Sequence, residues 1–355
     1  MLLLTLLSVA LADSVESSAP VPILFDTDIA SDCDDAGALA VLHELADRGE
    51  ATILATVVNR GDANGRSASA VDAINTFCGR GDVPIGVDRD TRFIDHAGKA
   101  GKAGKSAFTT AIHEEFPHDA RGRDETFPAA VEVMQAALRS QPDGSVTVCS
   151  VGALSNLAAL LEAEGGRDLV AAKVRQLVVM GGGFPRTHRP ETNLLLDPVA
   201  AVRVARDWPT PVLWQGFEVG AVVVSGSALK SVPSPNPTKR AFELRPYRGR
   251  MAIDGGKPSH DQVATLLAVR GLDGFAEGTW RISPPGRVVI DSRGQSEWQP
   301  ERNGRHRYVT LLGAPDALAD EIDALMTART QPATDTATDT ATDTAIDTAD
   351  GDAGE

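Results

Sequence analysis

The chain has 355 residues, of which 42% are hydrophobic and 23% are charged, and its formal net charge is −15. This apolar content is enough for the core of one large domain or two ordinary ones, which excludes disorder over most of the chain. So acidic a surface repels phosphate backbones and anionic lipids, and we therefore expect neither nucleic acid nor a membrane as a partner.

The first twelve residues, MLLLTLLSVALA, are uncharged, strongly apolar and end in small residues. This pattern is typical of a secretory signal, although no basic residue precedes the apolar run. The run is shorter than the roughly 20 apolar residues of a membrane span. We therefore expect residues 1–12 to direct export, to the periplasm or outside the cell, with a frayed N-terminal segment as the alternative.

Short apolar runs then alternate with longer segments of helical period. Strands are predicted at Val21–Phe25, Ala51–Val58, Val83–Val87, Ser145–Val151, Val174–Met180 and Pro211–Trp214. Helices are predicted at Asp34–Arg48, Ser69–Cys78, Pro128–Ser140, Leu154–Glu164, Pro198–Trp208 and His260–Arg270. This alternation favours an α/β fold, with a mostly parallel central sheet flanked by helices. In such sheets ligands bind beyond the carboxyl ends of the strands.

Three segments depart from this alternation. Residues 88–126 are polar and rich in glycine, which is typical of either a mobile lid or a surface excursion. Residues 271–312 contain the runs GTWRIS, RVVIDSRG and HRYVTLLG, which predict a small antiparallel C-terminal appendage before a last helix at Pro315–Ala328. Residues 330–355 repeat Thr, Asp and Ala, hold seven acids and no base, and predict a disordered tail.

Five aspartates fall within ten residues directly after the first predicted strand: Asp26, Asp28, Asp32, Asp34 and Asp35. Carboxylates crowded at the end of a buried strand repel one another unless a cation or protons compensate their charge. Ca²⁺, which accepts several oxygen ligands in flexible geometry, suits such a loop. Capping of the following helix is the alternative, but it accounts for only one or two acids. The cluster therefore predicts a metal site.

This segment resembles the DxD…DDA signature of the inosine–uridine preferring nucleoside hydrolases. Further resemblances follow in the family's order, at VGALSNLA (151–158), VVMGG (178–182), Glu191-Thr192-Asn193 with Asp197-Pro198, and Ser259-His260-Asp261. Each match alone is weak, but four in order at comparable spacing make chance an unsatisfactory explanation. The chain therefore resembles a divergent member of this family over residues 21–312.

The resemblance implies a catalytic domain over residues 21–328 that hydrolyses the N-glycosidic bond of a ribonucleoside, with Ca²⁺ at the C-terminal edge of the sheet. It implies that Asp28 binds the ion and acts as general base on a metal-bound water. The other ligands it implies are the carboxylates of Asp35 and Asp261 and the backbone carbonyl of Val151. Family members are commonly dimers or tetramers, so a homo-oligomer is possible.

Substrate contacts are also implied by the resemblance. Asp34 would hold a ribose hydroxyl, while Glu191 and Asn193 would grip the sugar from the opposite wall. Asn59, at the end of the second strand, adds another sugar contact. His260 matches the position from which some members protonate the departing base, and a surface histidine at a helix start is the alternative.

The chain also departs from the family pattern. Five residues separate Asp28 from Asp34, where most members have three, so Asp32 could take a metal or sugar role. Residues 183–188 lack the family's asparagine, and Thr192 replaces an aromatic residue. These departures lie mostly on the substrate wall rather than at the metal.

Two other functions are compatible with parts of the pattern. In a haloacid-dehalogenase-like phosphatase, Asp26 and Asp28 would be nucleophile and acid with Mg²⁺, but the later motifs would have no role. A non-catalytic binding protein would keep the calcium and sugar pocket without turnover. Three cysteines, Cys33, Cys78 and Cys149, are too few and too scattered for a zinc site or a disulfide framework.

Overall fold

The computed structural model describes residues 19–333 except 31, 60–62, 90–104, 121 and 188. The expected export leader lies outside the described residues, as does the repeat tail beyond residue 333. The same holds for the middle of the polar stretch 88–126. The described remainder of that stretch contains a helix that was not predicted, α3 (Ala107–Glu115).

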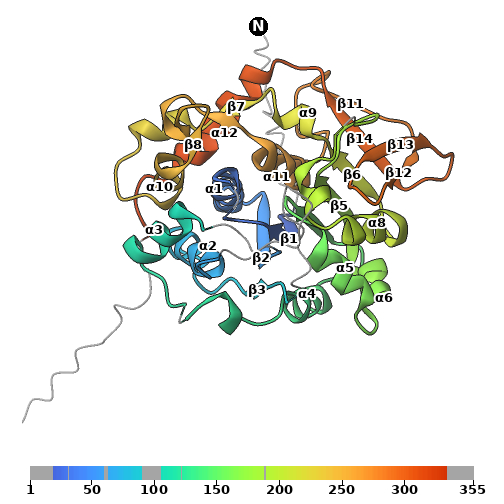
Figure 1. Cartoon of the computed structure of the whole chain (residues 1–355), viewed down its shortest axis with the longest axis horizontal. Coiled ribbons are helices and arrows are strands. Elements are labelled where there is room, and N and C mark those ends of the chain that lie inside the picture. Colours follow the sequence, from blue (N-terminus) through green and yellow to red (C-terminus); the bar gives the residue numbers. More distant parts are fainter. Residues whose placement is uncertain are drawn as a thin grey trace, which may run out of the picture.

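A ten-stranded sheet runs through the middle of the molecule (Figure 1). Its strands lie in the order β13-β12-β14-β6-β5-β4-β1-β2-β3, and β11 pairs with β14. The six strands of the first part are β1 (Val21–Thr27), β2 (Ala51–Val58), β3 (Ile85–Val87), β4 (Val146–Ser150), β5 (Val174–Met180) and β6 (Val212–Gln215). All of their pairings are parallel, which confirms the predicted mostly parallel sheet.

The C-terminal strands extend this sheet instead of standing apart from it. They are β11 (Trp280–Ile282), β12 (Gly286–Ile290), β13 (Ser296–Pro300) and β14 (His306–Leu311). β12 is antiparallel to β13 and β14, as expected, but β14 also pairs in parallel with β6. The expected antiparallel appendage is thus confirmed, and its strand β14 also joins it to the parallel part of the sheet. β13 was not predicted because its sequence, SEWQP, carries a single large apolar side chain.

Helices bury their apolar sides on both faces of the sheet, as Figure 1 shows. The core on one side includes α1 (Asp34–Asp47), α2 (Ser67–Phe77), α3, α10 (Pro237–Leu244), α11 (His260–Arg270) and α12 (Pro315–Ala328). The core on the other side includes α4 (Ala130–Arg139), α5 (Ser155–Glu162), α6 (Gly166–Lys173) and α8 (Pro198–Asp207). Short connecting elements are α7 (Thr192–Leu196), α9 (Phe217–Gly220), β7 (Val224–Ser225), β8 (Pro246–Tyr247), β9 (Arg250–Met251) and β10 (Lys257–Pro258).

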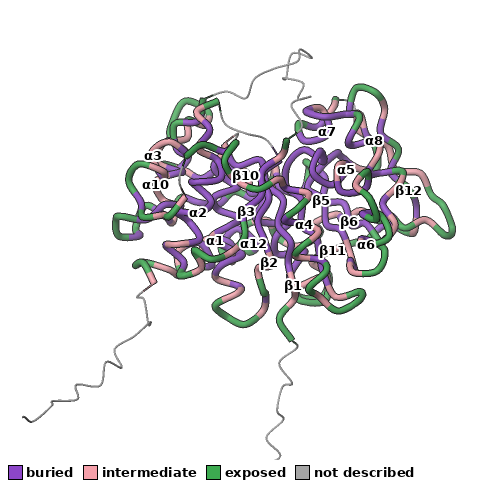
Figure 2. Tube along the Cα trace, turned by 90° about the horizontal axis from the view of Figure 1, so that it is seen from below, coloured by how far each residue is buried: buried purple, intermediate pink, exposed green. Residues whose placement is uncertain are grey.

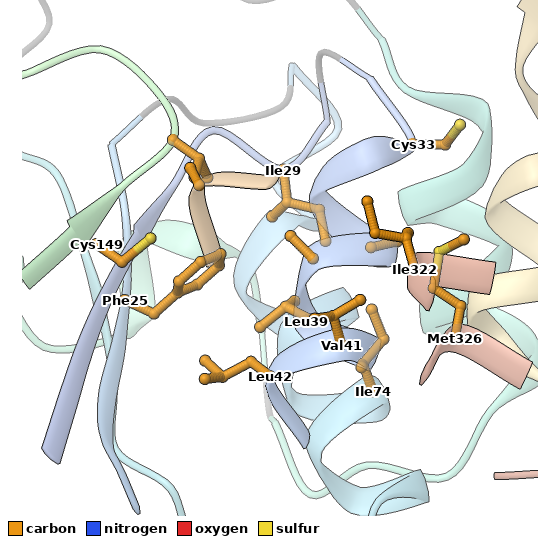
Figure 3. Packing of buried hydrophobic residues seen from close by; sticks show 14 of the residues in the cluster. Phe25, Ile29, Cys33, Leu39, Val41, Leu42, Ile74, Cys149, Ile322 and Met326 are labelled. Carbon is orange, nitrogen blue, oxygen red and sulfur yellow. The ribbon is translucent and has the colours of Figure 1, made fainter. Parts of the chain in front are cut away.

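α1 is apolar on nearly all sides because it is covered on nearly all sides. It lies between the sheet and the helices α11 and α12, so that Leu39 packs near Phe25 and Ile322 within one cluster (Figure 3). Burial of such side chains removes apolar surface from water and holds the first turn of α1 in place against β1. Figure 2 shows the same arrangement, with buried residues through the centre and exposed residues on the outer loops.

The three cysteines are buried and unpaired. Among the described residues, no helix has both the length and the apolar character needed to cross a bilayer.

Candidate active site

A cavity of about 260 Å³ lies at the carboxyl edge of the parallel strands. Because parallel strands end at one edge, residues that follow β1, β4, β5 and β6 meet there with the start of α11. The cavity is lined by eight of the nine residues predicted for the site, namely Asp28, Asp34, Asp35, Val151, Glu191, Asn193, His260 and Asp261. The ninth, Asn59, is not among the lining residues.

Three buried carboxylates form the densest part of this cavity. One oxygen from each of Asp34, Asp35 and Asp261 can be chosen so that all three lie within 4.8 Å of one another. Burial, followed by repulsion from neighbouring aspartates, raises the pKa of Asp35 and of Asp261 well above the usual range. Asp34, predicted to hold only the sugar, thus belongs to the same cluster as the expected metal ligands.

This cluster fits a hard divalent cation. Asp35 accepts a hydrogen bond from Thr27 through Oδ1, while its buried Oδ2 has no hydrogen-bond partner among the described residues. An unsatisfied buried carboxylate oxygen is costly, and a cation bound by oxygen ligands removes that cost. We therefore assign Asp35 and Asp261 to a candidate metal site, beside Asp34.

Asp28 and Val151 line the same cavity, each just after the end of one of two neighbouring strands, β1 and β4. A side chain at Gly152 would place its Cβ 2.8 Å from the Cβ of Asp28, so only glycine permits this approach of the two loops. The carbonyl oxygen of Val151 accepts a hydrogen bond from Nδ2 of Asn193 at 2.9 Å. A carbonyl oxygen has two lone pairs, so this hydrogen bond leaves one of them available for a metal ion. The role of Val151 as a metal ligand stays a prediction.

Asp26 lies behind the cavity instead of lining it. Its carboxylate accepts hydrogen bonds from Ser150 Oγ at 2.7 Å and Asn156 Nδ2 at 2.9 Å. Burial raises the pKa of Asp26 to about 7, against the opposing effect of these donors and of Asn59. Asn59 is fully buried beside it. Neither residue lines the cavity, which gives Asp26 no place as a phosphatase nucleophile. A sugar contact by Asn59 stays a prediction.

Lys257 is the main residue of the site that the sequence did not indicate. Its ammonium nitrogen lies 2.8 Å from Oδ1 of Asp34 and 2.9 Å from Oδ2 of Asp32. Arg245 contacts the other oxygen of Asp32 at 3.0 Å. Burial opposes ionisation of Asp32, but Lys257 and Arg245 outweigh it and lower the pKa of that carboxyl. Asp32 therefore lines the cavity and pairs with basic side chains, and a metal or sugar role for it stays a prediction.

The opposite wall is built around Glu191 and Asn193. The carboxylate of Glu191 caps α7, accepting hydrogen bonds from the backbone N–H groups of Asn193, Leu194 and Gly182. Burial raises the pKa of Glu191 to about 7, with these N–H groups acting in the opposite direction. Asn193 spans from Val151 to the carbonyl of Met180. Both side chains are positioned to face the cavity, and their contact with a sugar stays a prediction.

His260 begins α11 and stacks on Phe217, which follows β6. Burial, reinforced by the positive charge of Lys257, lowers the pKa of His260 to about 4. The ring is therefore neutral near pH 7. A general acid that protonates the departing base is expected to have a pKa closer to neutrality. Phe217 was missed because residues 215–220 also fit a glycine-bounded turn. Its position directly after a parallel strand was the available signal.

The chain matches a family model described as inosine-uridine preferring nucleoside hydrolase over residues 23–316. It is 24% identical over 293 residues to the non-specific ribonucleoside hydrolase RihC of Klebsiella pneumoniae (strain 342). That alignment covers 78% of this chain and 90% of the relative.

Solved structures share the fold at lower identity. The effector protein XOO4466 aligns with a TM-score of 0.67 and 17% identity, covering 88% of this chain and 95% of the other. The inosine-uridine preferring nucleoside hydrolase of Bacillus anthracis aligns with a TM-score of 0.60 and 14% identity, covering 87% and 99%. These likenesses bear on the fold, and they agree with the parallel sheet described above.

Proposed function

The chain belongs to the inosine-uridine preferring nucleoside hydrolase family and is therefore an N-glycosyl hydrolase, and we propose that its reaction is the Ca²⁺-dependent hydrolysis of a ribonucleoside to nucleobase and ribose. The observation that carries this proposal is the buried group of Asp34, Asp35 and Asp261 beside Asp28. Asp28, Asp35, Asp261 and the Val151 carbonyl would hold the ion.

The proposed chemistry divides between the ion and the side chains. A bound divalent ion lowers the pKa of a water molecule in its coordination shell. Asp28 then accepts the proton of the attacking water. Asp34, Glu191 and Asn193 hold the sugar hydroxyls from two walls of the cavity. Because loss of the base leaves an oxocarbenium-like sugar, the surrounding carboxylates stabilise positive charge on the ring.

The nucleobase would lie toward His260 and Phe217. The neutral imidazole can donate or accept a hydrogen bond without carrying a stored proton. Phe217 offers an aromatic face at the cavity wall. In this scheme His260 orients the leaving base by a hydrogen bond, and a solvent water donates the proton that the base gains on departure.

The proposal is tested by incubating the full chain with inosine and with uridine, with and without a chelator. We expect release of base and reducing sugar, loss of both on chelation, and recovery on addition of Ca²⁺. The Asp28→Asn variant should bind nucleoside but release no sugar. Tight binding without product in the wild-type protein would favour a non-catalytic binding protein, and phosphate release from a phosphomonoester panel would favour the phosphatase.

The location of the protein is a separate proposal. We propose that residues 1–12 act as an export leader, because they are apolar and end in small residues. Fusion of these residues to a reporter should carry it out of the cytoplasm. Retention of the fused reporter in the cytoplasm would contradict this assignment.

A further inference from the structure

Lys257 places a positive charge inside the cavity that is expected to bind a cation. Its side chain is only 3% exposed, and its ammonium group lies within 3 Å of one oxygen each of Asp32 and Asp34. Asp34 shares its cluster with Asp35 and Asp261. A divalent ion and Lys257 therefore face the same carboxylates.

The position of Lys257 is fixed from two directions. Its backbone belongs to β10, which pairs with Ser225 of β7. Asp32, its second partner, is itself held by Arg245 at 3.0 Å. Because both the backbone and the partner carboxylate are anchored, the ammonium group has little room to withdraw when a metal ion enters.

We propose that Lys257 is a built-in counter-ion of the metal site. It neutralises part of the carboxylate cluster in the metal-free protein, and it weakens the binding of Ca²⁺ by repelling the ion and by engaging Asp34. This inference rests on the proposed Ca²⁺ dependence and deepens it. Lys257 is thus a positioning residue that sets the affinity of the site for metal.

The physical basis is the balance of buried charge. Burying several carboxylates without a cation is costly, and a paired ammonium group offsets that cost. Repulsion between two cations at a few ångströms is strong in a partly buried site. The same lysine therefore stabilises the metal-free fold and disfavours the metal-loaded one.

The test uses calorimetric titration with Ca²⁺ and thermal unfolding of the full chain with and without a chelator. Lys257→Met removes the charge, while Lys257→Arg keeps it. Lys230→Met is the matched control, because Lys230 also pairs with an aspartate, Asp254 at 2.8 Å, but on the surface. We expect Lys257→Met to bind Ca²⁺ at least about tenfold more tightly and to lose stability in chelator.

The other variants should behave differently. Lys257→Arg and Lys230→Met are expected to stay within about threefold of the wild-type affinity, since both keep the charge in the cavity. Equal or weaker Ca²⁺ binding by Lys257→Met overturns the inference, as does an equally large gain in Lys257→Arg. A Lys257→Met protein that folds only with Ca²⁺ supports it.

Two results separate this inference from the proposed function. If the wild-type protein binds Ca²⁺ and hydrolyses nucleosides while Lys257→Met binds it no more tightly, only the counter-ion role fails. If the wild-type protein binds no Ca²⁺, both proposals fail. Should Lys257→Met not fold in either condition, Lys257→Gln gives the same readouts with a polar, uncharged side chain.

Discussion

The imidazole ring of His260 stacks on the ring of Phe217, with ring centroids 4.8 Å apart and planes inclined by 26°. Phe217 is nevertheless 52% exposed and lines the cavity, so part of its surface is available to a ligand. The pair joins His260, from the segment Ser259-His260-Asp261, to a residue that follows β6.

Removal of the Phe217 ring should weaken substrate binding more than catalysis. Aromatic pairs contribute about 0.5–1.5 kcal/mol, so we expect Phe217→Ala to raise KM for nucleosides by about two- to tenfold with a smaller effect on kcat. Steady-state kinetics with inosine and uridine measure this. Val222→Ala is the control, because Val222 is equally exposed and is not among the residues lining the cavity. An unchanged KM in Phe217→Ala would refute the assignment.

Neutralising Asp35 should weaken the binding of Ca²⁺ and at the same time stabilise the metal-free protein. We expect Asp35→Asn to bind Ca²⁺ at least about tenfold more weakly, because it removes one charge from the proposed ligand set. In chelator the same variant should unfold at a higher temperature, because burial raises the pKa of Asp35 and so disfavours its charged form.

Titration calorimetry and thermal unfolding test both effects. Asp143→Asn is the control, since the side chain of Asp143 is 78% exposed. Wild-type Ca²⁺ affinity in Asp35→Asn would be incompatible with this metal site.

Gly152 allows the loop after β4 to approach Asp28. A Cβ atom there would lie 2.7 Å from the side chain of Asn59 and 2.8 Å from the Cβ of Asp28. We therefore expect Gly152→Ala to displace Asp28 and lower kcat by more than about tenfold. Gly313→Ala is the matched control, because its Cβ would meet nothing closer than 3.3 Å. Equal activity of the two variants would show that the close approach is unimportant.

His43 provides a pH dependence away from the cavity. Its ring lies 2.8 Å from Oδ1 of Asn75, and burial lowers its pKa from 6.5 to about 4. As the pH falls, His43 therefore takes up a proton in the unfolded chain before it does so in the folded chain. The stability that the fold has while His43 is neutral in both states is lost as the pH falls from about 6.5 towards 4. The loss amounts to about 3 kcal/mol over that window.

His43→Gln keeps a donor for Asn75 but cannot titrate. We expect its free energy of unfolding, measured with urea at pH 7 and pH 4.5, to fall less with acidification than that of the wild-type protein. The comparison isolates His43, because the buried acids titrate equally in both proteins. Identical pH dependence in the two proteins would show that His43 is not held neutral by burial.

Much of the fold and site followed from local patterns. Apolar runs that alternate with helical periods predicted β1 to β6 in chain order, because each strand is buried on both faces. The same logic located the aspartates after β1, since residues that follow parallel strands share one edge of the sheet. Eight of the nine residues that the resemblance to the family implied for the site line the cavity.

The charge state of the site was decided only by the tertiary structure. Lys257 and Arg245 are far from Asp32 in the sequence, and no local pattern marks them as its partners. Likewise, the low pKa of His260 depends on burial beside Lys257.

The amino-acid sequence by itself thus determined the class of fold and the edge where the site lies, because these depend on periodicity and chain order, while the individual site residues were implied by the resemblance to the family. The tertiary structure decided which carboxylates come together at the cavity and which of them are paired with basic side chains. It did so because desolvation and Coulomb interaction act between atoms that only folding brings close together.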